Sequence, residues 1–103
     1  MFFFLVFLKD LNQLTSLSKN IGNLVNIRVL SLSDNSITDL PPEISNCSNL
    51  TFLNLRNNKI KSVTGLLTNY ANLERLYLGG NLISEIPEDI ENCQNLLELD
   101  LAS

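Results

Sequence analysis

Few side chains in this sequence could take part in covalent chemistry. The chain has no histidine and two cysteines, Cys47 and Cys93, so a serine or cysteine nucleophile would have no imidazole to activate it. Two separated thiols without a histidine also make a poor metal site. The carboxylates Glu98 and Asp100 are two residues apart, as solvated acids on one face of a strand commonly are. We therefore predict that the protein is not an enzyme and has no catalytic residue, no metal site and no cofactor.

A second set of side chains suits binding. Arg75 follows Phe52 by 23 residues, and Tyr77 follows Asn54 by the same interval. Aromatic and arginine side chains dominate many protein interfaces, because they bring a large contact area and a forked set of donors. The recurring interval raises the question of which elements bring such positions together.

The 23-residue interval extends through most of the chain. The stretches that begin at Leu30, Leu53 and Leu76 read LSLSDNSITDLPPEI, LNLRNNKIKSVTGLL and LYLGGNLISEIPEDI, and their apolar positions coincide. Self-similarity at a fixed period of this length indicates a solenoid. Three units can be written, and a partial unit follows them: 27–49, 50–72, 73–95 and 96–103.

The shared pattern is LxxLxLxxNxIxxLPxxI, which resembles the leucine-rich repeat in its 23-residue form. The prolines Pro41 and Pro87 make it similar to the intracellular scribble and Ras-suppressor repeats. The resemblance covers the chain from about Leu14 onward. It implies an α/β fold, a single-domain right-handed β/α solenoid with a parallel concave sheet and short helical or 3-10 segments on the convex side. It indicates little about function, since this fold carries many unrelated binding tasks.

Each unit should combine a short strand with a return segment. In the stretch RVLSL, alternation directs Leu30 and Leu32 toward the core. Val29 and Ser31 then point outward. Pro41 can open a short helical turn, because its φ is already helical. The middle unit has SVTGLLTNYAN without a proline, so we expect a more irregular return segment there.

Outward strand positions of successive units should form columns on one concave face. We expect this face to bind a protein or peptide, with the aromatic and arginine side chains at its centre. The alternative is that Phe52 merely covers backbone and that Arg75 pairs with a neighbouring carboxylate. The residues predicted to form the interface are Val29, Phe52, Asn54, Arg56, Arg75, Tyr77, Glu98 and Asp100.

Asn35, Asn58 and Asn81 share one position, at the bend that follows each strand. A buried bend leaves backbone groups that must be paired, and an amide can both donate and accept. We therefore predict a structural asparagine ladder, with a polar ligand channel as the alternative. Gly79 and Gly80 precede the last asparagine without the lysine of a phosphate loop, and we expect a bare, flexible patch there.

Cys47 and Cys93 share another position, two units apart. Two strand spacings separate them by about 10 Å, beyond the roughly 7 Å between Cα atoms that a disulfide can bridge. Free core thiols and the lack of cysteine-bridged caps favour a reducing compartment, and hence a cytoplasmic location. A secreted protein or the ectodomain of a membrane receptor stays open as an alternative.

The two ends depart from the pattern. Residues 1–26 begin with MFFFLVFL, which fits a degraded first repeat with Phe4 and Phe7 in apolar positions, although Lys9 stands where a core leucine belongs. A leader remnant is the alternative, but a basic region and a small-residue cleavage site are missing. The last unit stops after its strand. Because solenoid ends need capping, we expect a fragment of a longer array or self-association through open ends.

Length and charge limit the function further. A chain of 103 residues with a net charge of −4 suits one small soluble domain without a membrane span. Because the chain is not basic, we expect no nucleic-acid partner. The sequence favours a non-enzymatic interaction module, such as a scaffold or adaptor in signalling. The alternatives are a structural spacer in a longer array and part of a ligand-sensing receptor ectodomain.

Overall fold

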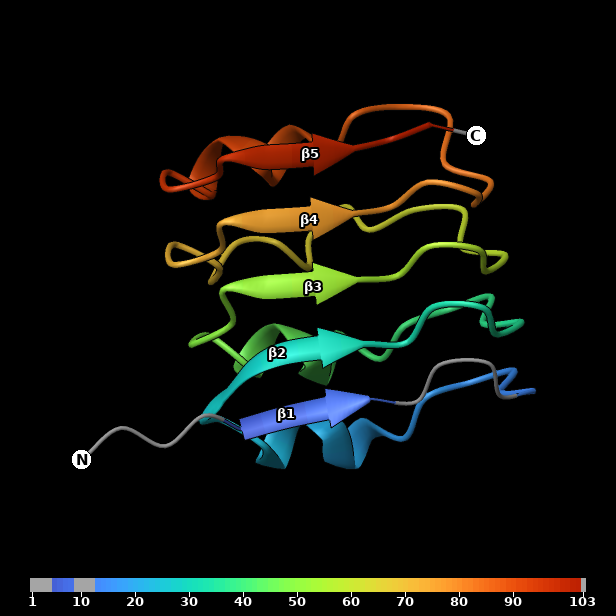
Figure 1. The fold of residues 1–103 in the computed structure, drawn as a ribbon, viewed down its shortest axis with the longest axis horizontal. Helices are drawn as coiled ribbons and strands as arrows, with labels where there is room; N and C mark the ends of the chain where they lie inside the picture. Colours follow the sequence, from blue (N-terminus) through green and yellow to red (C-terminus); the bar gives the residue numbers. More distant parts are fainter. Residues whose placement is uncertain (1–4, 9–12, 103) are drawn as a thin grey trace.

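A computed structural model describes residues 5–8 and 13–102. Five parallel strands form one sheet in which chain order is also spatial order, so each strand lies beside the next one in the sequence (Figure 1). The strands are β1 (Leu5–Leu8), β2 (Ile27–Ser31), β3 (Phe52–Asn54), β4 (Arg75–Tyr77) and β5 (Glu98–Asp100).

The strand register reproduces the sequence repeat. Leu30 pairs with Leu53, Leu53 with Leu76, and Leu76 with Leu99, so every step to the next strand is one 23-residue unit. At the other edge, Phe7 of β1 pairs with Leu30. Phe4 and Lys9 lie outside the described residues. The interpretation of residues 1–26 as a degraded repeat stays a prediction.

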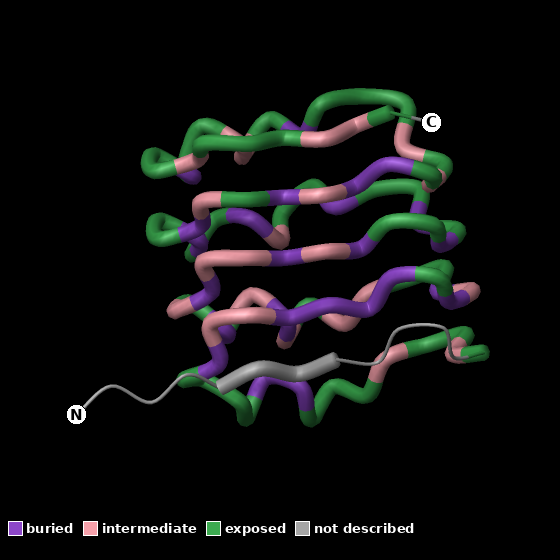
Figure 2. The backbone as a smooth tube through the Cα atoms, viewed as in Figure 1, coloured by how far each residue is buried: buried purple, intermediate pink, exposed green. Residues whose placement is uncertain are grey.

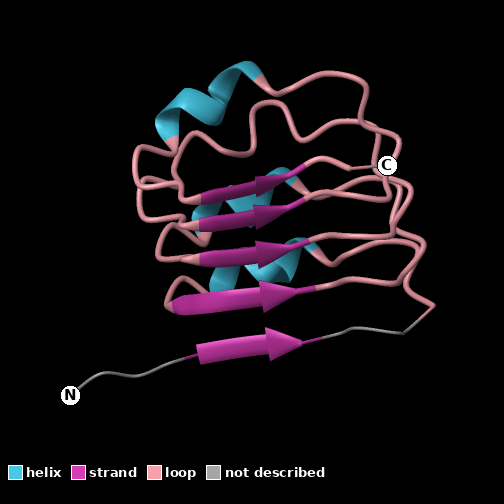
Figure 3. Ribbon diagram, turned by 45° about the horizontal axis from the view of Figure 1, so that its top comes forward, coloured by secondary structure: helices cyan, strands magenta, loops and turns pink. Residues whose placement is uncertain are grey.

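Short 3-10 helices lie on the other side of the molecule from the sheet (Figure 3). They are η1 (Lys19–Asn23), η2 (Pro42–Asn46) and η3 (Glu88–Asn92). The prediction that Pro41 opens the turn is wrong by one residue. Pro41 is the extended N-cap, with ψ of 140°, and the helix begins at Pro42. The prediction of an irregular middle unit is confirmed, since no helix lies between β3 and β4.

The core lies between the sheet and the return segments, and in β3 and β4 the central leucine is buried while its two neighbours are more exposed (Figure 2). The repeated leucine, isoleucine and cysteine positions of the inner units are almost entirely inaccessible to solvent. One unit alone could not bury these side chains, and stacked units cover them from both sides. The predicted α/β leucine-rich-repeat solenoid is therefore confirmed. Within the described residues, no helix is both long and apolar enough to cross a membrane.

The glycine pair before the last asparagine is tightly constrained, so the prediction of a bare, flexible patch is wrong. Gly79 is buried, and a Cβ there would lie 2.5 Å from the carbonyl oxygen of Ala102. Gly80 has a φ of 72°, close to the values of 60° at Asp34 and 59° at Asn57 in the equivalent positions. Every complete unit thus makes its bend through one left-handed residue, and a glycine adopts that conformation without steric cost.

Candidate protein-binding face

The outward side chains of β2 to β5 form two adjacent rows because side chains alternate along each strand. Phe52 pairs with Arg75, and Arg75 pairs with Glu98, in the row that begins at Val29. The neighbouring row contains Ser31, Asn54, Tyr77 and Asp100. Seven of the eight predicted interface residues therefore belong to these rows. The eighth, Arg56, lies two residues beyond the end of β3.

Two aromatic rings meet at the centre of this face. Phe52 and Tyr77 make an edge-to-face contact, with ring centroids 5.3 Å apart and an interplanar angle of 86°. The guanidinium carbon of Arg56 lies 4.2 Å from the centroid of the Tyr77 ring. An arginine over an aromatic face is attracted by the ring quadrupole and is held in place by it. Both rings are half-buried, so part of each stays accessible to a partner.

The charged residues around the rings pair with one another. Arg56 Nε donates to Asp100 Oδ2 at 2.8 Å, and Arg75 Nε donates to Glu98 Oε1 at 3.3 Å. The Tyr77 hydroxyl donates to Glu98 Oε2 at 2.6 Å. We call the set Phe52, Arg56, Arg75, Tyr77, Glu98 and Asp100 the concave cluster.

These ion pairs hold the cluster in one arrangement more than they stabilise the fold. The side chains of Arg75 and Glu98 are 46% and 52% exposed, and exposed pairs contribute about 0–1 kcal/mol. Among the described residues, both arginines use only Nε for side-chain hydrogen bonds. Their terminal nitrogens are therefore free to donate to a partner. The alternative interpretation of Arg75 was partly correct, since it does pair with a neighbouring carboxylate.

The hydrogen bonds of the cluster set its protonation states. The bond from Tyr77, and then the one from Arg75, lower the pKa of Glu98. The guanidinium of Arg56 lowers the pKa of Asp100. The hydrogen bond to Glu98 raises the pKa of Tyr77, because it stabilises the protonated phenol. Both carboxylates are therefore ionised, and the phenol is neutral, near neutral pH.

The N-terminal part of the face differs in character. Val29 is half-buried beside Phe52, and the expectation that Ser31 points freely outward is wrong because its neighbours bury it. Asn54 serves the backbone, since its Oδ1 accepts from the amide of Arg56 at 3.1 Å. The aromatic and charged side chains are thus gathered toward β3, β4 and β5.

The three asparagines of the predicted ladder each bridge two units. Asn58 Oδ1 accepts from the amide of Ile37 in the preceding unit at 3.0 Å. Asn58 Nδ2 donates to the carbonyl of Leu32, also in the preceding unit, and to that of Leu55 in its own. Asn81 repeats this arrangement. Asn35 likewise accepts from the amide of Leu14 in the preceding unit and donates to the carbonyl of Leu32 in its own. All of these partners are backbone groups of the fold, which supports the structural interpretation.

Sequence reasoning missed a second ladder inside the convex side. The Cys47 thiol donates to the carbonyl of Ile21 at 3.3 Å, and the Tyr70 hydroxyl donates to the carbonyl of Ile44 at 2.7 Å. Cys93 lies in the same position relative to Leu67, with a longer distance of 3.9 Å. Both thiols are free and buried, and burial raises the pKa of each. The signal in the sequence was a donor side chain at this position in each of the three complete units, Cys47, Tyr70 and Cys93.

Asp89 was also missed. Its Oδ2 accepts from the amides of Gly65 and Leu67, both at 2.9 Å. Because Asp89 lies in η3, these bonds connect η3 to the irregular return segment of the preceding unit. Its buried Oδ1 has no hydrogen-bond partner among the described residues. Asp89 lies among other acids, Glu88 and Glu91, and the sequence does not show which of them has this role, because the role depends on the missing helix one unit earlier.

Two sequence profiles match the chain. The profile described as Leucine Rich repeats (2 copies) matches residues 25–68, and the one described as Leucine Rich Repeat matches residues 72–93. The chain belongs to the leucine-rich repeat family. No curated protein matches the sequence.

Solved structures agree with this assignment of the leucine-rich repeat chain. An internalin (InlF) from Listeria monocytogenes has 27% identity over 92% of the chain, with a TM-score of 0.78. A leucine-rich repeat protein from Leptospira interrogans has 34% identity over 85% of the chain, with a TM-score of 0.73. Toll from Drosophila, solved in a complex with Spatzle, has 29% identity over 87% of the chain, with a TM-score of 0.80. The chain spans 27%, 23% and 12% of these structures, respectively.

None of these three structures is named as a scribble or Ras-suppressor protein, so that finer resemblance stays a prediction. No group of three or more cysteine or carboxylate side chains in residues 5–8 and 13–102 is arranged to hold a metal ion.

Proposed function

We propose that this leucine-rich repeat segment is a protein-binding module and that a protein or peptide partner docks on the concave cluster. The observation that carries the proposal is the contact of Arg56 with the face of Tyr77 beside Phe52. Because the rings and guanidinium groups are already ordered by their contacts with one another, they lose little conformational freedom when a partner binds. They also have the composition that dominates interface energetics.

The fold itself does not require these side chains. The row that holds Phe52 and Arg75 holds Val29 one unit earlier, and the row that holds Tyr77 holds Ser31. The core leucines between them are the same in each unit. Bulky, at least partly exposed and mutually ordered side chains at positions that the fold leaves open are therefore best explained by a contact with a partner.

The chemistry of the cluster indicates the class of partner. Two arginines are balanced by two carboxylates, so the face carries charges of both signs, and both hydrogen-bond donors and acceptors, around an apolar centre. This pattern suits a protein surface or a peptide more than a polyanion such as nucleic acid. The hydrogen bond to Glu98 raises the pKa of Tyr77 and keeps the phenol protonated, and the chain has no histidine to act as a base, so binding rather than catalysis is proposed.

A peptide-display selection against the folded chain tests the proposal. Peptides enriched on the wild type should bind Phe52→Ala and Tyr77→Ala about tenfold more weakly or worse, since truncating a hot-spot residue costs about 1–2 kcal/mol or more. Exposed residues away from the sheet, Lys61 and Glu91, provide matched controls as Lys61→Ala and Glu91→Ala. If the control variants weaken binding and the cluster variants do not, the proposed face is wrong.

The comparisons also support two other candidate functions. The chain covers only part of each longer solved relative, which suits a spacer segment whose contacts lie in other units. The similarity to Toll suits a segment of a receptor ectodomain. If the segment is a spacer, none of the peptides enriched in the display selection should bind the cluster variants more weakly than the wild type. Locating the tagged full-length protein in its own cells would separate the cytoplasmic interpretation from an ectodomain.

A further inference from the structure

We propose, on the basis of the function proposed above, that the docking segment presents an aspartate or glutamate side chain next to an apolar one. Arg56 and Arg75 bind its carboxylate, and the apolar side chain packs against Phe52. The observation behind this assignment is the hydrogen-bonding capacity of the concave cluster. Among the described residues, the cluster has unused arginine donors, whereas each of its carboxylate oxygens already accepts a hydrogen bond.

The two carboxylates of the cluster are engaged on both oxygens. Glu98 accepts from one arginine with Oε1 and from the Tyr77 hydroxyl with Oε2. Asp100 accepts from the other arginine with Oδ2 and from the backbone amide of Ala102 with Oδ1, at 3.3 Å. A lysine or arginine of a partner would therefore have to share an oxygen that a group of this chain already occupies.

The arginines, in contrast, keep most of their donors. Each uses Nε alone for side-chain hydrogen bonds among the described residues, although a guanidinium also carries N–H groups on its terminal nitrogens. The side chains of Arg56 and Arg75 are 44% and 46% exposed, so a partner can reach those nitrogens. Their planar, forked geometry matches the two oxygens of a carboxylate, so an acidic side chain is the ligand that fits.

Both guanidinium groups lie around one aromatic pair. Arg56 contacts the face of Tyr77. Arg75 donates to Glu98, the same carboxylate that the Tyr77 hydroxyl contacts. The hydrogen bonds from Tyr77 and Arg75 lower the pKa of Glu98, and the charge of Arg56 lowers it further, so both arginines act on one carboxylate. Because Phe52 lies edge-to-face against Tyr77, an apolar side chain next to the incoming acid meets an aromatic ring.

The total charge of the partner matters less than the position of its acid. The two arginines of the cluster are balanced by its two carboxylates, and the whole chain has a net charge of −4. Long-range attraction to a polyanion is therefore weak. A single acidic side chain can still be bound through short, directed hydrogen bonds to the terminal nitrogens.

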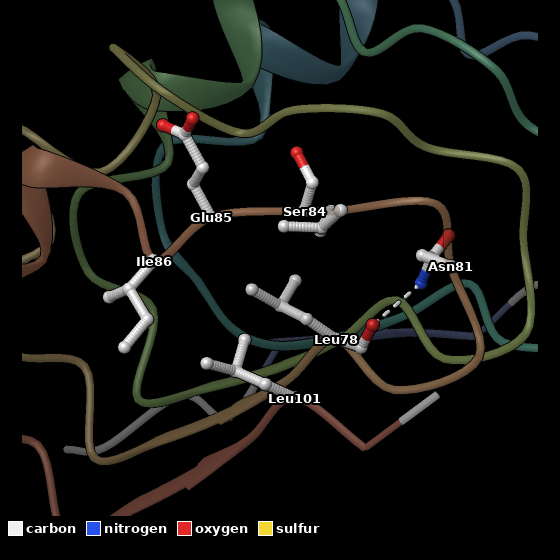
Figure 4. Close-up of a pocket in the computed structure, with 7 residues that line it drawn as sticks. Leu78, Asn81, Ser84, Glu85, Ile86 and Leu101 are labelled. Carbon is white, nitrogen blue, oxygen red and sulfur yellow. Dashed lines mark hydrogen bonds between the residues drawn. The ribbon is translucent and has the colours of Figure 1, made fainter.

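The pocket beside the last asparagine of the ladder does not offer this chemistry. It has a volume of about 180 Å³, and the side chains of Leu78, Ile86 and Leu101 lie around it (Figure 4). Asn81 Nδ2 donates to the carbonyl of Leu78 at 2.9 Å, so this amide serves the fold. The charged residue in the lining is Glu85, which repels a carboxylate. An acidic side chain therefore favours the concave cluster.

Peptides enriched by display on the folded chain test the proposal. Those that bind Phe52→Ala more weakly should share an aspartate or glutamate next to a large apolar residue. Replacing that acid by its amide in a synthetic peptide should weaken binding about tenfold or more. If the amide peptide binds equally well, or if the shared residue is a lysine or arginine, this proposal is wrong while the proposed face stands. If no enriched peptide is weakened by Phe52→Ala, the proposed function itself fails.

Two charge-preserving variants test the role of the arginines. Arg56→Lys and Arg75→Lys keep the charge but lose the forked terminal nitrogens, so each should weaken binding of the acidic peptide about tenfold and change binding of its amide counterpart much less. Arg28→Lys, at the remaining arginine of the chain, is the matched control and should bind like the wild type. If both cluster variants bind the acidic peptide as tightly as the wild type, the arginines do not hold its carboxylate and the proposal is wrong.

Discussion

The hydroxyl of Tyr70 donates to the carbonyl of Ile44, 26 residues earlier. In the units on either side, the thiols of Cys47 and Cys93 make the equivalent contact from the same position. The phenol is longer than a thiol, and it occurs in the unit whose return segment has no helix. A single position thus keeps one hydrogen bond with two different side chains.

Replacing Tyr70 by phenylalanine should reveal what that bond contributes. Tyr70→Phe keeps the ring and leaves the buried carbonyl of Ile44 without its donor, so the free energy of unfolding should fall by about 1–3 kcal/mol. Urea denaturation measures it. Tyr77→Phe, on the exposed face, is the matched control and should change stability by less than about 0.5 kcal/mol. Equal losses would refute a special role for the buried phenol.

Removing the central asparagine should destabilise the solenoid. Asn58→Ala leaves the amide of Ile37 and the carbonyl of Leu32 unpaired, and we expect a loss of about 1–3 kcal/mol in the free energy of unfolding. Asn57→Gly is the control at the adjacent residue. It should stay within about 0.5 kcal/mol, because Gly80 already occupies the equivalent left-handed position. A larger loss at Asn57 than at Asn58 would contradict the ladder.

Stability should fall at alkaline pH because of the two thiols. Burial raises the pKa of Cys47 and Cys93 above the ordinary value of 9.0. The unfolded chain therefore loses thiol protons near pH 9 that the folded chain retains, and the stability present below pH 9 is lost as pH rises toward the folded values. Urea denaturation from pH 8 to pH 10 measures the slope.

The double variant with Cys47→Ala and Cys93→Ala serves as the comparison for that slope. It is less stable at every pH because core volume is lost, but its stability should depend less on pH over this range. A slope as steep as that of the wild type would show that another group, such as the phenol of Tyr70, whose pKa is also raised by burial, causes the alkaline loss.

Cutting the link from η3 should loosen the middle unit locally. Asp89→Ala removes the acceptor for the amides of Gly65 and Leu67, so hydrogen exchange at Leu67 should become faster while the amide of Leu55 keeps its protection. Glu88→Ala, at the exposed neighbouring residue, should leave both rates unchanged. Faster exchange at both amides in Asp89→Ala would indicate global destabilisation instead.

The register of the sheet was predictable because three units repeat the same apolar positions, and a slip of one residue would expose every buried leucine. The rows of the concave face follow from that register alone. The pairing of Arg75 with Glu98 was also foreseen, because these residues lie in adjacent units. The pairing of Arg56 with Asp100 was not, because these residues are two units apart. Neither Asp89 nor Gly79 could be interpreted from its own unit, since each depends on backbone that belongs to a neighbouring one.

The ladders also have a direction. Asn58 bonds backbone of the unit before it, and Cys47, Tyr70 and Asp89 do the same, so these side chains reach toward the N-terminus. On a ribosome, the N-terminal units emerge first. Each newly made unit therefore finds its hydrogen-bond partners already present on the nascent chain, and the solenoid can grow stepwise during its own synthesis without waiting for residues still to be translated.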